Sequence, residues 1–222
     1  MGRANLVITI TDRSRHEEFA AWFQKRGIPM VLTTYGRGTA TTEILDYLGL
    51  EDTEKAVLFC VTPYSPRMVR QAAKELWLDV PGRGILMTVP ITSIGGVAAR
   101  DYLLQQEAEE VMEKELTHEL IVVITNQGYT DKVMDAARAA GATGGTAVHA
   151  KGTGTELAKK FFGVSNAAEK ELIFILTRTE DRKPIMKAVM AGAGMQTEAQ
   201  SLVFSLPVSD LAGLRQLDAE ME

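Results

Sequence analysis

The segment Leu120-Ile121-Val122-Val123-Ile124-Thr125 decides the fold, because an earlier segment, Leu6-Val7-Ile8-Thr9-Ile10-Thr11, has almost the same apolar pattern. Other pairs of similar residues keep nearly the same offset along the chain: Gly27 with Gly141, Gly38-Thr39 with Gly152-Thr153, Leu58-Phe59 with Ile173-Phe174, and Pro90 with Pro207. Matches held in register over so long a stretch indicate that the chain consists of two copies of one unit.

The spacing of apolar residues predicts the elements of each copy. In the second copy we expect a strand at 120–125, a helix at 130–140, strands at 146–150 and 171–177, a helix at 184–191 and a strand at 201–206. The first copy has the same order, with helices near 15–26 and 66–77. This βαββαβ order predicts an α+β fold of two tandem ferredoxin-like domains, each an antiparallel sheet with both helices on one face.

We place the two domains at residues 1–96 and 117–222. Residues 97–116 between them carry many glutamates and regularly spaced apolar side chains, which predicts an amphipathic connecting helix. Such a helix serves as a packed spacer or docks a partner. The strands at 57–61, 120–124 and 172–176 are apolar at nearly every position, so we expect the sheet faces without helices to be covered as well. We therefore predict a homo-oligomer.

Composition narrows the possible partners and the cellular location. The chain has 222 residues, a formal net charge of -5 and a sequence pI near 5.4, which argue against a general nucleic-acid binder. The single cysteine, Cys60, excludes an intrachain disulfide. With no basic leader and no apolar run of membrane-spanning length, we expect a cytoplasmic protein.

Glycine-rich connections are the candidate ligand-binding segments. They are Gly36-Arg37-Gly38-Thr39, Pro81-Gly82-Arg83-Gly84, and the stretch from Gly141 to Thr155. Successive backbone amides in such turns can converge on a phosphate, and Arg37, Arg83 and Lys151 add positive charge. Tight structural turns are the alternative explanation. No Walker-type or dinucleotide-binding fingerprint is present.

The second copy resembles the PII nitrogen-regulatory signalling proteins and their PII-like relatives. Gly141-Ala142-Thr143-Gly144-Gly145-Thr146 is similar to the family's Gly-Ile-Thr-Gly-Met-Thr motif, Lys151-Gly152-Thr153-Gly154 to its Lys-Gly-Phe-Gly motif at the base of the T-loop, and Leu202 to Val208 to its last strand. The resemblance covers essentially the whole chain, once per half. It implies trimers, or here a pseudo-trimeric arrangement of domains, that bind adenine nucleotides (ATP, ADP or AMP) in the clefts between subunits.

The resemblance also implies the site residues. The T-loop base of the first copy corresponds to Gly36, Arg37, Gly38 and Thr39, and the B-loop to Gly82, Arg83 and Gly84. The second copy supplies Thr143, Gly144, Gly145 and Thr146, its own T-loop base at Lys151, Gly152 and Gly154, and a C-terminal arginine, Arg215. The family's B-loop lysine falls at Ile85, and its second arginine at Gly213.

Each copy lacks a motif that the other keeps. The first has Ile28-Pro29-Met30-Val31 in place of the Thr-Gly-x-Thr motif, and the second has Ala199-Gln200-Ser201 in place of the B-loop glycines. We therefore predict a nucleotide site that pairs the loops of the first copy with the second-strand beginning of the second copy.

Catalytic and metal-binding patterns are weak. His149 lies at the end of a predicted strand, close to Lys151 and the glycines, and could act as a base or a metal ligand, although an outward-facing polar residue is the simpler interpretation. His16 and His118 have no second ligand at suitable spacing, and Cys60 lies in an apolar strand that disfavours a reactive thiolate. We predict no enzyme activity and no metal site.

The expected function is that of a non-catalytic PII-like regulator. It would bind a small metabolite, an adenine nucleotide, in a cleft between domains and regulate a protein partner in nitrogen or transport regulation. The partner would be a membrane transporter or a regulatory enzyme. Ligand binding would order residues 40–53 or 155–168, which are shorter than the family's T-loop. Two alternatives stay open: an interaction scaffold with a vestigial nucleotide site, and a metal-responsive trimer of the cation-tolerance type.

Overall fold

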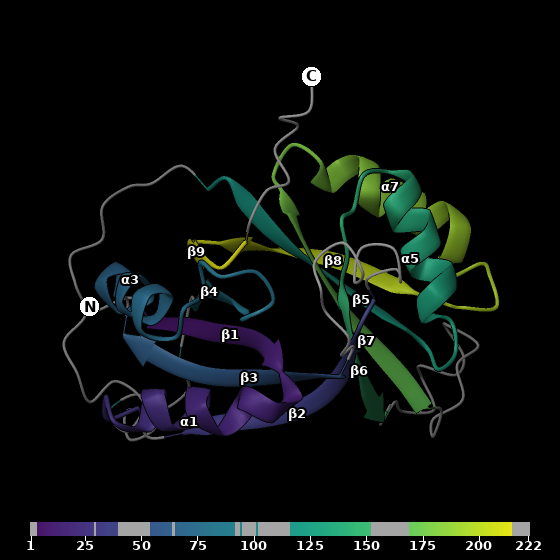
Figure 1. Ribbon diagram of the computed structural model, residues 1–222. Helices are drawn as coiled ribbons and strands as arrows, with labels where there is room; N and C mark the ends of the chain where they lie inside the picture. Colours follow the sequence, from purple (N-terminus) through teal and green to yellow (C-terminus); the bar gives the residue numbers. More distant parts are fainter. Residues whose placement is uncertain are drawn as a thin grey trace. The chain divides into compact units, whose positions relative to one another are not determined.

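Figure 1 shows the computed structural model, which describes residues 4–28, 30–39, 54–63, 65–91, 94, 101, 116–151 and 169–214. These residues form nine β-strands, four α-helices and one short 3-10 helix. The chain divides into two compact units: unit 1 contains Met1–Thr33, Ala56–Lys114 and Val208–Glu222, and unit 2 contains Thr34–Lys55 and Glu115–Pro207.

Unit 1 contains a sheet with the strand order β3-β1-β4-β9. Its elements are β1 (Ala4–Asp12), η1 (Arg13–Arg15), α1 (His16–Gln24), β3 (Glu54–Pro63), α3 (Pro66–Glu75), β4 (Ile85–Ile91) and β9 (Asp210–Ala212). β1 pairs antiparallel with β4, from Ala4 opposite Ile91 to Ile10 opposite Ile85. β9 then pairs antiparallel with β4, with Leu86 opposite Ala212.

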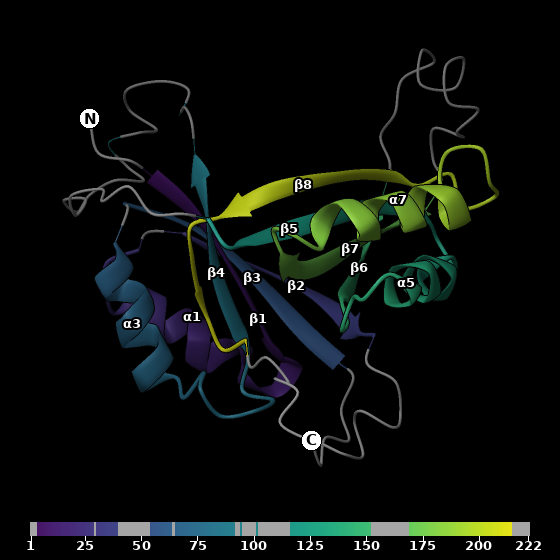
Figure 2. The same ribbon diagram turned by 90° about the horizontal axis from the view of Figure 1, so that it is seen from above.

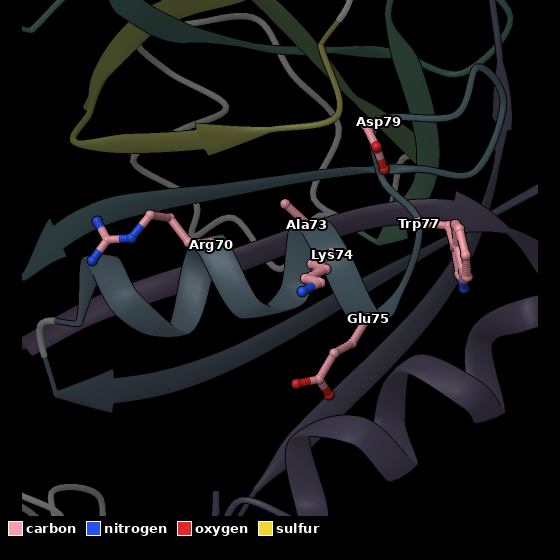
Figure 3. Close-up of a pocket in the computed structure, with 6 residues that line it drawn as sticks. All are labelled: Arg70, Ala73, Lys74, Glu75, Trp77 and Asp79. Atoms are coloured by element: carbon pink, nitrogen blue, oxygen red, sulfur yellow. The ribbon is translucent and has the colours of Figure 1, made fainter.

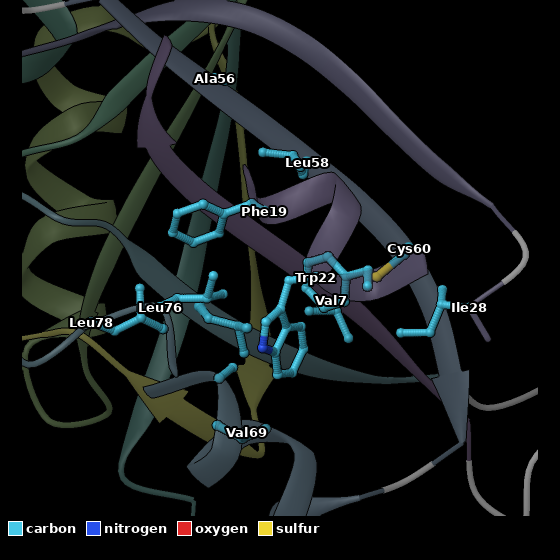
Figure 4. Packing of buried hydrophobic residues seen from close by; sticks show 13 residues of the cluster. Val7, Phe19, Trp22, Ile28, Ala56, Leu58, Cys60, Val69, Leu76 and Leu78 are labelled. Carbon is cyan, nitrogen blue, oxygen red and sulfur yellow. The ribbon is translucent and has the colours of Figure 1, made fainter. Parts of the chain in front are cut away.

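One hydrophobic cluster joins both helices of unit 1 to the same face of its sheet. Phe19, Trp22 and Phe23 come from α1, Val69 and Ala72 from α3, and Val7, Ala56, Leu58, Cys60 and Leu86 from the strands (Figure 4). The strand residues alternate along β1 and β3, because successive side chains of a strand point to opposite faces. α3 begins sharply, since the Ser65 side chain accepts a hydrogen bond from the Met68 N–H and Pro66 occupies the first helical position.

Unit 2 contains a sheet with the strand order β8-β5-β7-β6-β2. Its elements are β5 (His118–Asn126), α5 (Thr130–Ala139), β6 (Thr146–Lys151), β7 (Glu169–Arg178), α7 (Arg182–Ala193), β8 (Leu202–Val208) and the greater part of β2 (Val31–Gly38). β7 is the central partner, antiparallel to β5 over nine residue pairs and to β6 over six.

The helices α5 and α7 cover one face of the unit 2 sheet. Figure 2 shows them side by side over its strands, and one cluster contains Val133, Met134 and Ala137 of α5, Ile185 and Val189 of α7, and Ile121, Val123, Ile173 and Ile175 of the sheet. None of the described residues buried in this cluster is aromatic, whereas the cluster of unit 1 contains three aromatic residues of α1. Burial of these aliphatic side chains is the main term that holds the helices to the sheet.

The α+β class and the antiparallel sheets are confirmed, and the predicted order of elements in residues 118–208 matches the observed one. The helix expected at 130–140 is Thr130–Ala139, and that expected at 184–191 is Arg182–Ala193. In the first half, the helix expected near 15–26 starts as a 3-10 turn and becomes α-helical at His16. The sequence did not predict β9, a strand of three residues.

Other predicted segments fall outside the described residues. They are the connecting helix at 97–116, apart from Asp101 and Leu116, and the segments at 40–53 and 155–168. Every helix in the described part of the chain is too short or too polar to cross a lipid bilayer.

Candidate functional site

Two of the predicted ligand-binding segments meet in unit 2. The end of β2 runs antiparallel to β6, with Gly36 opposite Val148, Arg37 opposite Ala147 and Gly38 opposite Thr146. We call Gly36–Thr39, together with Thr143–Val148, the glycine seam. At Gly36 a Cβ atom would lie 2.2 Å from the Ala147 carbonyl oxygen and 2.7 Å from Val148 Cγ1. The seam therefore requires glycine at this position for close approach of the backbones.

Thr39 closes the seam through three hydrogen bonds with Gly145. Its N–H donates to the Gly145 carbonyl oxygen at 2.9 Å, and its hydroxyl donates to the same oxygen at 2.9 Å. The Gly145 N–H in turn donates to the Thr39 hydroxyl at 2.8 Å. Because both amides already have acceptors, an incoming anion would have to displace Thr39 or Gly145 from the other to use them.

Two arginine side chains, Arg37 and Arg138, belong to the surroundings of the seam. The Arg138 guanidinium, in the last turn of α5, donates to the Thr39 carbonyl oxygen and forms an ion pair with Asp135 at 3.3 Å. Its Nε atom is buried and has no hydrogen-bond partner in the part of the chain that the structure describes. Arg37 forms an exposed ion pair with Asp131 at 3.5 Å. The seam thus carries positive charge that is partly neutralised by two aspartates.

Arg138 was not among the predicted site residues. The signal that could have identified it is its place in the last turn of a helix, just before the glycine-rich stretch, where cations are common. Gly141 ends this helix with φ of +100°, and the N–H groups of Gly141 and Ala142 donate to Arg138 and Ala137. This C-cap sets the direction in which the chain enters the seam.

The other predicted residues of unit 2 differ in accessibility. Thr143 is exposed, and nothing lies within 4 Å of a Cβ placed on Gly144, whereas Thr146 is buried. Lys151 ends β6 opposite Glu169. Gly152, Gly154 and Arg215 lie outside the described residues. Among the described positions, the open part of the seam is therefore at Arg37, Thr143 and Gly144.

The turn with Gly82, Arg83 and Gly84 belongs to unit 1 and precedes β4. Gly82 and Gly84 have φ of +79° and +140°. The Arg83 carbonyl oxygen accepts from the Thr11 hydroxyl at 2.9 Å and from Arg15 Nη1 at 2.8 Å. Arg15 also donates to the Leu76 carbonyl oxygen at 3.3 Å. The end of β1 and the start of α1 thus hold this turn in place.

His149 and Cys60 are the residues that the sequence offered for catalysis or metal binding. His149 is 68% exposed, and its Nδ1 lies 3.9 Å from the Glu171 carboxylate. That carboxylate is buried and accepts from the Thr130 hydroxyl at 2.6 Å and the Gly128 N–H at 3.3 Å, so it caps the start of α5. Burial raises the pKa of the Cys60 thiol to about 12, which keeps it protonated at neutral pH. The described residues contain no group of three potential metal ligands.

One protein-family model matches part of the chain. The family model of the nitrogen regulatory protein P-II matches residues 118–217. No curated protein matches the chain. Two solved structures align with most of the chain at low TM-scores. An unknown protein from Galdieria sulphuraria has TM-score 0.29 and 9% identity, covering 94% of this chain and 99% of its own. A glycine cleavage system transcriptional repressor has TM-score 0.24 and 12% identity, covering 93% and 99%.

Proposed function

We propose that the protein is a non-catalytic PII-like regulator, because the family model of the nitrogen regulatory protein P-II matches residues 118–217. It binds a small metabolite, an adenine nucleotide, and acts on a protein partner in nitrogen or transport regulation. The proposal includes two tandem PII-like domains, at 1–96 and 117–222, and an oligomer in the cytoplasm.

The topology of the two units supports the tandem origin. In unit 1 the strands are ordered β4-β1-β3, and in unit 2 their counterparts in chain order are ordered β8-β5-β7. In unit 1 the helices that follow β1 and β3 pack in one cluster on one sheet face, and in unit 2 the helices that follow β5 and β7 do the same. A duplicated unit would produce this correspondence together with the repeated sequence pattern.

The glycine seam is the proposed contact for the nucleotide phosphates. Arg37 is half exposed, and its one ion pair within the described residues is at the surface, where it contributes little to stability and can be exchanged for a phosphate. Arg138 supplies a second guanidinium at the Thr39 carbonyl. A phosphate that took over the amides of Thr39 and Gly145 would separate these two residues and order residues 40–53, which follow Thr39 directly in the sequence. This ordering is the proposed signal to the partner.

Titration calorimetry with ATP, ADP and AMP tests the proposal. Arg37→Ala should weaken nucleotide binding by roughly ten-fold, because it removes one charge-assisted hydrogen bond. Arg178→Ala is the matched control, since Arg178 is also in unit 2 and forms a comparable exposed ion pair, with Glu180 at 3.6 Å. It should leave affinity unchanged. Absence of binding at millimolar nucleotide, or equal effects of both variants, would refute the proposed site.

An interaction scaffold is the second candidate, and one observation favours it. The Thr39 and Gly145 amides, which a phosphate would need, already have acceptors within the protein. A scaffold would keep the seam closed in every state. Amide hydrogen exchange distinguishes the two functions. If the protein is a regulator, ATP should change the exchange rates of the Thr39 and Gly145 amides. If it is a scaffold, both rates should stay the same.

A further inference from the structure

Unit 1 contains a hollow at the beginning of α3 that is distinct from the glycine seam of unit 2. It has a volume of about 310 Å³, and the polar residues that line it are Arg26, Thr62, Ser65, Arg67 and Gln71. None of the described residues that line it is acidic. We call it the α3 hollow. Its size is within the range of small-molecule sites.

Positive charge converges on the α3 hollow from three sources. The first is the N-terminal end of α3, a helix of ten residues, where the helix dipole favours anions. The second is Arg67, an exposed side chain with no ion pair to any described carboxylate. The third is Arg26, which is held in place: Glu75 binds its Nη2 at 2.6 Å, and its guanidinium lies 3.7 Å from the centre of the Trp22 ring.

Thr62 gives an independent indication of a ligand. Thr62 lines the hollow and is only 2% exposed, and its hydroxyl has no hydrogen-bond partner among the described residues. A buried hydroxyl without a partner is unfavourable by about 1–3 kcal/mol, so such groups are rare unless something else binds them. An anion in the hollow would provide the missing acceptor.

A second hollow in unit 1 has different chemistry. Arg70, Ala73, Lys74, Glu75, Trp77 and Asp79 line it at the other end of α3 (Figure 3). Trp77 is 61% exposed and has φ of 58°, but two acidic residues offset the two basic ones. None of the buried unpartnered side-chain atoms belongs to its lining residues. Of these two hollows, the α3 hollow is the one that combines an arginine without a counter-ion among the described residues, Arg67, with a buried hydroxyl unpaired among them.

We propose that the α3 hollow binds a small oxyanion, the phosphate or carboxylate group of a metabolite. The Arg67 guanidinium forms the charge-assisted contact, Arg26 provides the second cation, and the Thr62 hydroxyl donates a hydrogen bond. The site is independent of the nucleotide site proposed at the glycine seam, because all its residues belong to unit 1.

Titration of the full chain with inorganic phosphate, and separately with citrate, at constant ionic strength tests this proposal. Arg67→Ala and Thr62→Val should each weaken binding of the anion by roughly ten-fold, since each removes a hydrogen bond to a charged group. Arg70→Ala is the matched control, because Arg70 is an exposed arginine of the same helix that lines the other hollow. It should bind as the wild type does.

The variants also separate this site from the glycine seam. If phosphate binds and Arg37→Ala weakens it while Arg67→Ala does not, the anion binds at the seam and the α3 hollow proposal is wrong. Equal affinities of the Arg67→Ala and Arg70→Ala variants, or no binding of either anion at tens of millimolar, would also overturn it. Preference for phosphate over citrate, or the reverse, identifies the class of metabolite.

Discussion

The glycine seam and the α3 hollow are both candidate ligand sites, and they differ in how their polar groups are satisfied. At the seam, the amides of Thr39 and Gly145 and the Thr39 hydroxyl bond to each other. At the hollow, the Thr62 hydroxyl has no partner. The first site is closed by the protein itself, and the second offers unused hydrogen-bonding capacity.

This difference shows what glycine in a sequence can and cannot indicate. Gly36 is needed because the backbones of β2 and β6 approach closely, which is a packing requirement. A ligand site needs polar groups whose partners come from outside the protein. Glycine spacing can therefore mark a strand contact as readily as a phosphate site, and the predictions below test which applies.

The largest expected effect is on the packing of the seam. Gly36→Ala should lower the free energy of unfolding by about 3 kcal/mol, because the new methyl group would overlap the Ala147 carbonyl oxygen. This oxygen belongs to the backbone of β6, so it cannot move aside as the end of a flexible side chain could. Gly144→Ala is the matched control in the same seam, since nothing lies within 4 Å of its Cβ position. It should change stability by no more than about 0.5 kcal/mol.

Urea unfolding monitored by circular dichroism measures both changes. Similar small losses in the two variants would show that β2 can move away from β6 without cost. The seam would then be an open site, and its contrast with the α3 hollow would disappear.

The second effect concerns the hydrogen bonds that close the seam. Thr39→Val should destabilise the protein by about 2 kcal/mol, because it leaves the Gly145 N–H without its acceptor. Thr179→Val is the comparison, since the Thr179 hydroxyl makes a single exposed hydrogen bond, to the Leu116 carbonyl oxygen. Thr179→Val should lower the free energy of unfolding, measured with urea, by less than Thr39→Val does. Equal effects would mean that solvent already reaches the Thr39–Gly145 contact.

The sequence predicted regular elements better than it predicted the contacts between them. The strand expected at 146–150 is Thr146–Lys151 and that at 171–177 is Glu169–Arg178, because their apolar residues follow the strand period. β9 was missed because three residues carry too little pattern, and its partner β4 lies far away in the sequence.

The candidate sites show the same limit. Thr39 and Gly145 were both named as candidate residues, but that they bond to each other depends on the pairing of β2 with β6, which no local spacing specifies. Thr62 was not singled out for a site at all. Its importance comes from burial without a partner, and that property exists only in the folded chain.

The third effect has the opposite sign and belongs to the α3 hollow. Without added anion, Thr62→Val should stabilise the protein by about 1 kcal/mol, because a methyl group replaces a buried hydroxyl that has no partner. Thr125→Val is the matched control: Thr125 is also buried, but its hydroxyl donates to the Ala199 carbonyl oxygen at 3.0 Å. It should destabilise. Changes of opposite sign in the free energy of unfolding, measured with urea, would support the contrast between the α3 hollow and the glycine seam. A loss of stability in both variants would show that the Thr62 hydroxyl has a hydrogen-bond partner without a ligand.

The smallest effect is a pH dependence beside the α3 hollow. Hydrogen bonds from the Trp22 indole and then from Arg26 hold the pKa of Glu75 below its ordinary value of 4.5. Since the pKa is lower in the folded state, ionised Glu75 contributes stability above about pH 4.5, and this contribution is lost as the pH falls through the folded-state pKa. Glu75→Gln should therefore lose less stability than the wild type between pH 5 and pH 3 (roughly the range of carboxyl titration).

Glu17→Gln, at an exposed position of α1, is the matched control for the loss of one carboxylate. It should follow the wild-type pH profile in urea unfolding. If Glu75→Gln follows that profile too, Glu75 does not fix Arg26 at the α3 hollow. The hollow would then depend on Arg67 alone for its charge, and the predicted loss of anion binding in Arg67→Ala should become nearly complete.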